Sequence, residues 1–313
     1  TVFGESAGGM SILDLMASPL AEGLFHRAIV ESGPLLELGL AVNRTPTLRE
    51  AEKTGEGISR KLGCDKADDE LAALREVTPD RLIEASSSDN EFFSPINFSP
   101  NIDGYLLPVP PLEVFAAGRQ HAVPLLTGVN ANEGTVFIPD VTLQQYRLMA
   151  GYLYGDHAEE VMALFPAGSE EEVKPALDRV ITEMGFASSA RFTADCAEKA
   201  GLPAYLYLFD RTSRDARTQG LGSFHGLEIV YVFGNLDKVQ LQGVDQEDRD
   251  LSEAMMAYWT GFARAGAPNG PGLPSWPEYE SSSAPYQILG TKIESGTGYF
   301  QRSYDLVRKI RGW

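Results

Sequence analysis

Cysteine and histidine are both scarce in this chain of 313 residues, which contains two cysteines and four histidines. Two cysteines do not make a disulfide framework, so Cys64 and Cys196 are expected to be buried small side chains or unused thiols. The chain also lacks an H-E-x-x-H motif, an EF-hand loop and a P-loop. We therefore expect neither a metal nor an organic cofactor.

Basic clusters and long apolar runs are absent as well. The chain has 26 Lys and Arg against 44 Asp and Glu, a formal net charge of −18. Nucleic-acid binding normally requires a basic face, so nucleic acid is not an expected partner. No apolar run reaches the roughly 18 residues that a membrane span needs. The chain does not begin with Met and shows no leader, which leaves a cytoplasmic and a secreted location open.

Short apolar segments alternate with helical patterns along the chain. We expect strands at residues 1–3, 28–30, 123–129, 204–209 and 286–289, with a further strand and loop within 100–111. Helices are expected at 7–16, 47–62, 68–76, 79–85, 251–265 and 302–311. The block 142–200 is also expected to be helical, with breaks at Gly155, Pro166 and Gly168. Strands that alternate with helices predict an α/β protein whose mainly parallel sheet is covered by helices on both faces.

The chain shows no convincing linker, repeat or low-complexity segment. We therefore expect residues 1–313 to form a single domain, in which the helical block at 142–200 lies over the sheet as a cap-like subdomain. Thr47 and Glu50 have the spacing of a capping box, which predicts the start of the helix at 47–62.

The pentapeptide Gly4-Glu5-Ser6-Ala7-Gly8 is a G-x-S-x-G motif between an expected strand and an expected helix. In this arrangement the serine sits on a strained turn that lifts its hydroxyl above the sheet, and the glycines remove clashing side chains. The turn also directs the backbone N–H of Ala7 toward a developing oxyanion. The motif alone is weak, because a turn of small residues between strand and helix would look the same.

A nucleophilic serine needs a base, most often histidine, and only four candidates exist. His26 and His121 precede strands and so lie at the wrong end of a parallel sheet, because sites form at the carboxyl ends of strands. His157 begins a charged helix. His225 follows the strand at 204–209 through a Gly-rich loop, so it is the expected base.

The acid should follow a strand between the serine and the histidine. Glu133 comes directly after the strand at 123–129 and is the expected acid. Asp103 precedes Gly104 and reads better as an Asx turn. Asp140 lies farther from the strand, whereas Asp210 ends the strand at 204–209 and competes less well, because it lies close to His225 in sequence.

Several longer motifs occur in one order along the chain. They are GESAGG at 4–9, AIVESGP at 28–34, NIDGYLLPVPP at 101–111, NANEGTVF at 130–137, FHGLEIVYVFGN at 224–235, GFARAGAPNG at 261–270 and SWPEY at 275–279. Together they resemble the type-B carboxylesterase/cholinesterase-like family of α/β-hydrolases over nearly the whole chain.

The resemblance implies an α/β-hydrolase fold and a catalytic triad of Ser6, Glu133 and His225. It implies a serine carboxylesterase that cleaves a small-molecule carboxylic ester through an acyl-enzyme. It also implies that Ser32 supports the triad. Many secreted relatives pair the cysteine at the position of Cys64 with a downstream cysteine that this chain lacks, so no disulfide bond is expected there.

The family also carries a long segment before its nucleophile, with the first strands and a glycine-rich loop that supplies further oxyanion donors. The expectation is therefore a partial hydrolase domain, in which the 313 residues expressed alone are poorly soluble and nearly inactive. Losing even one oxyanion donor costs roughly 10²–10³ in rate.

Three alternatives remain open. The chain could be an inactive fragment, a peptidase or thioesterase with the same triad, or a non-catalytic interaction or adhesion protein. Relatives of the last kind generally lose the serine or the histidine. Met184 and Phe186 are candidates for an acyl pocket, although helix packing explains them better. Two glycosylation sequons, at 43–45 and 97–99, are expected by chance and do not decide the compartment.

Overall fold

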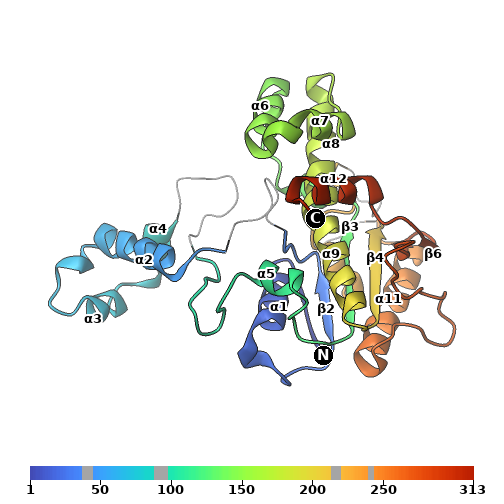
Figure 1. Cartoon of the computed structure of the whole chain (residues 1–313), viewed down its shortest axis with the longest axis horizontal. Coiled ribbons are helices and arrows are strands. Elements are labelled where there is room, and N and C mark those ends of the chain that lie inside the picture. The colour runs from blue at the N-terminus through green and yellow to red at the C-terminus, as the bar shows by residue number, and fades with distance from the viewer. Residues whose placement is uncertain (37–44, 88–97, 213–219, 239–242) are drawn as a thin grey trace. The chain divides into compact units, whose positions relative to one another are not determined.

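The computed structural model describes residues 1–36, 45–87, 98–212, 220–238 and 243–313 (Figure 1). The chain divides into two compact units, a larger one made of Thr1–Val42 and Pro111–Trp313 and a smaller one made of Asn43–Pro110. A single domain over residues 1–313 stays a prediction beside this division. The asparagines of both sequons, at 43 and 97, lie outside the described residues.

The larger unit is built on a six-stranded sheet whose spatial order follows the sequence. Its strands are β1 (Val2–Glu5), β2 (Ala28–Glu31), β3 (Leu125–Asn130), β4 (Ala204–Asp210), β5 (Tyr286–Gly290) and β6 (Ile293–Gly296). The first five pair in parallel, and β6 pairs antiparallel with β5. Because the five parallel strands end at one edge, the residues that follow them gather there.

One face of the sheet packs against α11 (Gln246–Ala265). Alternate strand side chains, those of Ile29, Leu126, Tyr205, Tyr207 and Phe209, form one buried cluster with Leu251, Met255, Tyr258, Trp259 and Phe262 of the helix. Gly128 is required within this face, because a Cβ there would lie 2.4 Å from the ring of Tyr207 on the neighbouring strand.

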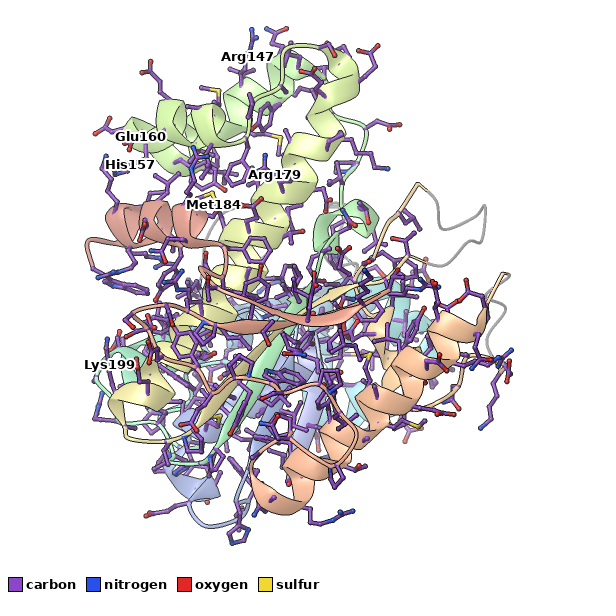
Figure 2. The ribbon with its side chains drawn as sticks, turned by 90° about the vertical axis from the view of Figure 1, so that its right-hand side faces the viewer. Arg147, His157, Glu160, Arg179, Met184 and Lys199 are labelled. Carbon is purple, nitrogen blue, oxygen red and sulfur yellow. The ribbon has the colours of Figure 1, made fainter. Side chains whose placement is uncertain are left out.

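The other face is covered by α1 (Ala7–Ala17) and α9 (Ser188–Lys199), with α5 (Pro111–Ala116) between them. Figure 2 shows α11 on the opposite side of the sheet from the helix that ends at Lys199. The expected parallel sheet with helices on both faces is thus confirmed. Both Cys64 and Cys196 are buried free thiols, as expected.

Helices continue through the block expected at 142–200. They are α6 (Leu143–Tyr154), the 3₁₀ turn η5 (Gly155–His157), α7 (Ala158–Leu164), α8 (Glu170–Arg179), the π-helix η6 (Val180–Ala187) and α9. In Figure 1, α6, α7 and α8 form a group beyond one end of the sheet. Whether this group caps a substrate site stays a prediction. Among the described residues, no helix is both long and apolar enough to cross a bilayer.

The smaller unit is helical. It contains α2 (Leu48–Leu62), η3 (Cys64–Lys66), α3 (Glu70–Arg75) and α4 (Pro79–Ser86). The capping box is present at the start of α2, since Thr47 Oγ1 accepts from the N–H of Glu50 and the Glu50 carboxylate accepts from the N–H of Thr47. The strand expected within 100–111 is reduced to one bridge, between Thr47 and Ile102.

Six short elements of the described residues were not predicted from the sequence, namely η1 (Pro19–Ala21), η3, α5, η4 (Glu133–Val136), α10 (Glu228–Val232) and β6. Each has at most six residues, which is too few for a hydrophobic period to emerge. The Ile293–Gly296 strand is also mostly polar, and it forms because β5 offers its free edge to it. The remaining helix, α12 (Gln301–Arg311), was expected.

Candidate active site

Ser6 occupies the sharp turn between β1 and α1. Its backbone has φ 54° and ψ −115°, a strained conformation for a residue that carries a side chain. The turn is possible because Gly4 and Gly8 touch. A Cβ on Gly4 would lie 2.8 Å from the carbonyl carbon of Gly8. Ala7 is the first residue of α1, so its backbone lies at the positive end of that helix.

Glu133 and His225 form a direct hydrogen bond above the carboxyl ends of β3 and β4. Glu133 begins the 3₁₀ turn η4 (Glu133–Val136), and its side chain is fully buried. His225 Nδ1 lies 2.5 Å from Glu133 Oε2. The other carboxylate oxygen accepts from Ser32 Oγ and from the backbone N–H of Asn130, each at 2.6 Å. Both oxygens of the acid are therefore engaged.

The second ring nitrogen of His225 faces Glu5 in this structure. His225 Nε2 lies 3.2 Å from Glu5 Oε1, which is ion-pair distance, but no directional hydrogen bond forms. Nε2 is buried and has no hydrogen-bond partner among the described residues, so the Ser6 hydroxyl does not donate to it here. Catalytic hydrogen bonds are often long or misaligned without substrate. The contact between the serine turn and His225 is made by Glu5, the residue before Ser6.

The charges around the imidazole favour its protonated form. Burial lowers the pKa of His225, but the hydrogen bond and charge of Glu133 and the charge of Glu5 outweigh it, and the pKa is raised. Burial also raises the pKa of Glu5, which His225 partly offsets. A protonated His225 is thus stabilised on both of its nitrogens.

Two further buried carboxyl groups lie behind the site. Burial raises the pKa of Glu31 to about 7, although its carboxylate accepts a hydrogen bond from Trp259 Nε1 at 3.1 Å. Burial and the charges of Glu133 and Glu31 raise the pKa of Glu228 well above its ordinary value. Asn130 Nδ2 donates to Glu228, which connects this acid to the strand end that precedes Glu133.

Two aromatic rings flank His225. The ring of Phe137 lies 4.9 Å from the imidazole, and that of Phe186 lies 5.1 Å away, centroid to centroid. Phe186 belongs to the π-helix η6, a distortion that often marks functional sites. Met184, on the same π-helix (Figure 2), is fully buried. The structure therefore places Phe186 at the site and Met184 in the core.

The loops that carry Glu133 and His225 are bonded to each other. The backbone of Asn132 donates to Ser223 O at 3.1 Å, and Asn132 Oδ1 accepts from the N–H of Ser223 at 3.0 Å. Gly222 has φ 64°, and a Cβ there would lie 2.1 Å from Asn132 Oδ1, so only glycine fits. Asp178 of α8 holds the same turn, since its carboxylate accepts from Asn132 Nδ2 and from the N–H of Gly134, each at 2.8 Å.

The histidines that the sequence analysis set aside have other surroundings. His26 is exposed. His121 Nε2 lies 2.6 Å from Ser18 O, and His157 pairs with Glu160 (Figure 2).

The acids that competed with Glu133 are also placed elsewhere. The Asp103 carboxylate accepts from the N–H groups of Tyr105 and Leu107, which is the expected turn role. Asp140 and Asp210 are exposed.

Sequence reasoning missed seven members of the site: Glu5, Glu31, Asn130, Asn132, Phe137, Asp178 and Glu228. All but Asp178 lie in the sequence close to a strand end or to a triad residue. Glu31 ends a strand, Phe137 lies four residues after Glu133, and Glu228 lies three residues after His225. Asp178 gave no such signal, because it reaches the site from a helix distant in sequence. The distinction that matters for Glu228, full burial of a carboxyl group, is visible only in three dimensions.

The mainly parallel sheet, its helical layers and the serine turn after β1 define an α/β-hydrolase fold. The chain belongs to the carboxylesterase family, whose model matches residues 1–307. A solved structure of a PNB esterase matches with a TM-score of 0.78 and 29% sequence identity, and the match covers 97% of this chain and 62% of that one.

Sequence similarity to individual esterases agrees with this family. The chain is 32% identical to carboxylesterase 1C of Rattus norvegicus, over 93% of this chain and 55% of that protein. It is 31% identical to para-nitrobenzyl esterase of Bacillus subtilis (strain 168), over 94% and 58%. It is also 31% identical to fumonisin B1 esterase of Sphingopyxis macrogoltabida, over 95% and 54%. The chain thus spans little more than half the length of these relatives.

Proposed function

We propose that this chain carries the catalytic triad of a serine carboxylesterase, with Ser6 as nucleophile, His225 as base and Glu133 as acid. One observation supports the proposal most. The Glu133–His225 hydrogen bond of 2.5 Å is built above the same sheet edge as the strained turn at Ser6. The relatives named as esterases support a small-molecule carboxylic ester as substrate.

In the proposed first step, the Ser6 oxygen attacks the ester carbonyl carbon while His225 Nε2 takes the hydroxyl proton. The Ala7 N–H, at the start of α1, donates to the oxyanion. Glu133 holds the proton on Nδ1 and stabilises the imidazolium. When the tetrahedral intermediate collapses, the alkoxide leaves with the proton of His225 and Ser6 is acylated. Water then repeats the sequence, with His225 again as base, and releases the carboxylic acid.

The surroundings of His225 fit a base that must carry charge in the transition state. Glu133 and Glu5 lie at the two ring nitrogens, and their charges favour the imidazolium. Ser32 and Asn130 satisfy the remaining oxygen of Glu133, which keeps that carboxylate from turning away. Phe137 and Phe186 present apolar surface beside the imidazole, which suits the organic part of an ester.

The full-length protein tests the proposal through covalent labelling and turnover. We expect a fluorophosphonate probe to label Ser6 and p-nitrophenyl acetate to be hydrolysed, with both lost in Ser6→Ala. Removal of a triad member lowers kcat by roughly 10⁴ or more, so His225→Gln should behave similarly. Ser11→Ala is the matched control. Ser11 lies in α1, the helix that follows Ser6, and its exposed hydroxyl donates to Ala7 O at 2.8 Å. The Ser11→Ala variant should retain activity.

A folded protein that resists the probe would contradict the proposal and favour a non-catalytic interaction protein on the same fold. Labelling without ester turnover would contradict the substrate class. A panel of peptides and thioesters would then identify a peptidase or a thioesterase.

A further inference from the structure

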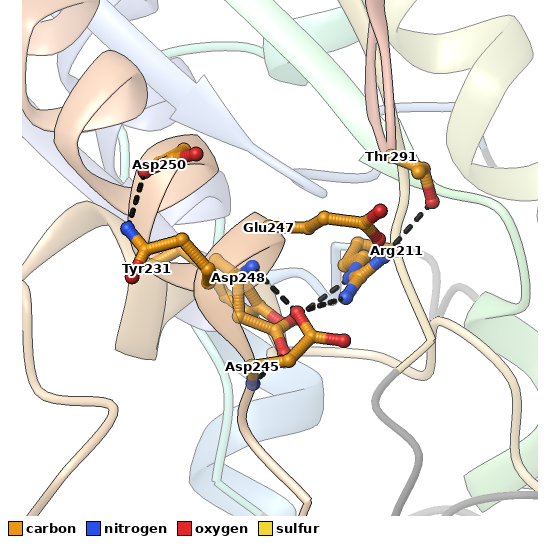
Figure 3. Close-up of polar contacts among 8 residues, drawn as sticks. Arg211, Tyr231, Asp245, Glu247, Asp248, Asp250 and Thr291 are labelled. Carbon is orange, nitrogen blue, oxygen red and sulfur yellow. Dashed lines mark hydrogen bonds and ion pairs between the residues drawn. The ribbon is translucent and has the colours of Figure 1, made fainter.

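A buried ionic cluster lies away from the triad, on the face of the sheet that α11 covers. Arg211 follows the last residue of β4, and its side chain is only 6% exposed. It donates to Asp248 at 2.6 Å, Asp245 at 2.8 Å and Glu247 at 2.9 Å, all at the start of α11. It also donates to Thr291 Oγ1, between β5 and β6, at 2.9 Å. Figure 3 shows the guanidinium enclosed by these groups.

Asp248 is the centre of this cluster. Its side chain is fully buried, and its Oδ1 accepts from both Arg211 Nε and the Tyr231 hydroxyl, the latter at 2.8 Å. Its Oδ2 accepts from the backbone N–H of Asp245 at 2.9 Å. Burial raises the pKa of Asp248, but the hydrogen bonds from Arg211, Asp245 and Tyr231 outweigh it and lower the pKa. The carboxylate is therefore ionised, with both oxygens in use.

The two donors to Asp248 Oδ1 stand on opposite sides of His225 in the sequence. Arg211 precedes the histidine, and Tyr231 follows it in α10. Tyr231 is held by two more contacts. Ser252 Oγ of α11 donates to its carbonyl oxygen at 2.7 Å, and its ring packs against Phe209 at 5.1 Å. One carboxylate oxygen thus joins the chain before and after the candidate base.

The residues just before His225 are bonded to the chain around Glu133. Residues 221–223 bond to the turn that carries Glu133, through Asn132 and Thr135, and the Phe224 carbonyl accepts from Asn130 Nδ2 at 2.8 Å. The residues that follow His225 turn immediately into α10, which packs on α11. The position of the imidazole relative to Glu133 therefore also depends on where α10 lies. This helix is bonded at two points, to Asn130 through Glu228 and to Asp248 through Tyr231.

Stability alone is a weak reason for such a cluster. It places one cation among three carboxylates, and removing charges from water costs about as much as their attraction returns. What a buried, fully bonded ionic group adds is a fixed geometry. Here the fixed geometry concerns the chain on both sides of His225.

We propose that Asp248 is a positioning residue, which joins Arg211 and Tyr231 and thereby holds His225 in bonding position to Glu133. The proposal rests on the proposed function, because it concerns the base of that reaction. Asp248 touches neither the substrate nor the reacting atoms, and it acts through α10.

Tyr231→Phe in the full-length protein is the decisive variant, because it removes one hydroxyl and leaves the ring, the helix and the Ser252 bond in place. We expect kcat to fall roughly tenfold with KM nearly unchanged, since a base displaced by about 1 Å costs on the order of 100-fold. Asp248→Asn keeps one acceptor and loses the charge, so it should act in the same direction.

A second readout does not need turnover. The proton between His225 Nδ1 and Glu133 should give a far-downfield proton NMR signal, assigned by its loss in His225→Gln. We expect Tyr231→Phe to shift it upfield or broaden it. If the parent protein shows this signal but hydrolyses no ester, the proposed function fails and the NMR comparison still decides the positioning role.

Arg249→Gln is the matched control. Arg249 is the next residue of α11, and it pairs with Asp237 at 2.8 and 2.9 Å in an exposed ion pair. The charge of Asp248 contributes only the smallest part of the rise in the pKa of Arg249, and Arg249 is not among the donors to the Asp248 carboxylate. The Arg249→Gln variant should leave kcat and the NMR signal unchanged. The proposal is overturned if Tyr231→Phe keeps both the parental kcat and the parental signal, whatever its effect on thermal stability. If Asp248→Asn fails to fold, Tyr231→Phe alone decides.

Discussion

At the scale of single residues, the site is defined by how its carboxyl groups differ. Both oxygens of Glu133 accept hydrogen bonds, Glu5 faces the second nitrogen of His225, and burial raises the pKa of Glu228 well above its ordinary value. The same side chain thus occurs as the partner of the base, as a nearby carboxyl group and as a buried group with a raised pKa. In active sites, different environments give similar side chains different pKa values, and this difference decides which group acts as acid and which as base.

The raised pKa of His225 predicts the pH dependence of ester hydrolysis. A general base must be neutral, so activity is present above the pKa of His225 and is lost as pH falls through it. Because Glu133 and Glu5 raise this pKa, the acidic limb of kcat/KM should have its midpoint above the ordinary histidine value of 6.5. Glu5→Gln removes one of these charges and should move the midpoint to lower pH.

A pH–rate profile of the parent and of Glu5→Gln, fitted for the acidic limb, measures both effects. Glu22→Gln changes an exposed carboxyl group away from the imidazole and should leave the limb where it is. An unchanged or higher midpoint in Glu5→Gln would show that Glu5 does not act on the base.

At the scale of elements, the site depends on junctions between strands and helices. β1 turns into α1 at Ser6, and β3 turns into η4 at Glu133. The first junction is possible only because Gly4 and Gly8 touch, and Gly9 meets Gly33 in the same way, since a Cβ on Gly9 would lie 2.9 Å from Gly33 Cα.

The two glycines of the motif are predicted to differ in their tolerance of alanine. A Cβ on Gly4 would lie 2.8 Å from a backbone carbon of Gly8, whereas a Cβ on Gly8 meets nothing within 4 Å. Gly4→Ala should therefore lower the free energy of unfolding by about 1–3 kcal/mol, the usual cost of overpacking. Gly8→Ala should change it little. Chemical denaturation of both variants checks this, and equal losses would refute the steric explanation.

Much of this arrangement was accessible from the sequence, for a physical reason. Triad candidates follow strands, and the carboxyl ends of parallel strands meet, so Ser6, Glu133 and His225 could be chosen by position along the chain. Asp178 and the Asp248 cluster could not. They reach the site or its support from helices, and the face that a helix buries there depends on packing rather than on local pattern. The contact of Glu5 with His225 was not predicted either, because the direction of a side chain at the end of a strand beside a tight turn depends on the three-dimensional path of the chain.

At the scale of the whole molecule, the two edge strands of the sheet differ in polarity. β6 is short and mostly polar, with charged Glu294 facing water. Within the described residues, β1 pairs only with β2, and Phe3 in its middle is 51% exposed. Phe3 lies 5.9 Å from the ring of Phe233, which is 53% exposed, so apolar surface is concentrated beside this edge.

An apolar edge strand is a template for pairing with another chain, so the 313-residue chain should self-associate through β1. Phe3→Lys places a charge in the middle of that strand and should lower the fraction of large species in light scattering at a given concentration. Leu24→Lys is the matched control, because Leu24 is 75% exposed but lies in a turn rather than on a strand edge. If both variants lower association equally, general surface hydrophobicity drives it. If Phe3→Lys has no effect on association, β1 is not the template.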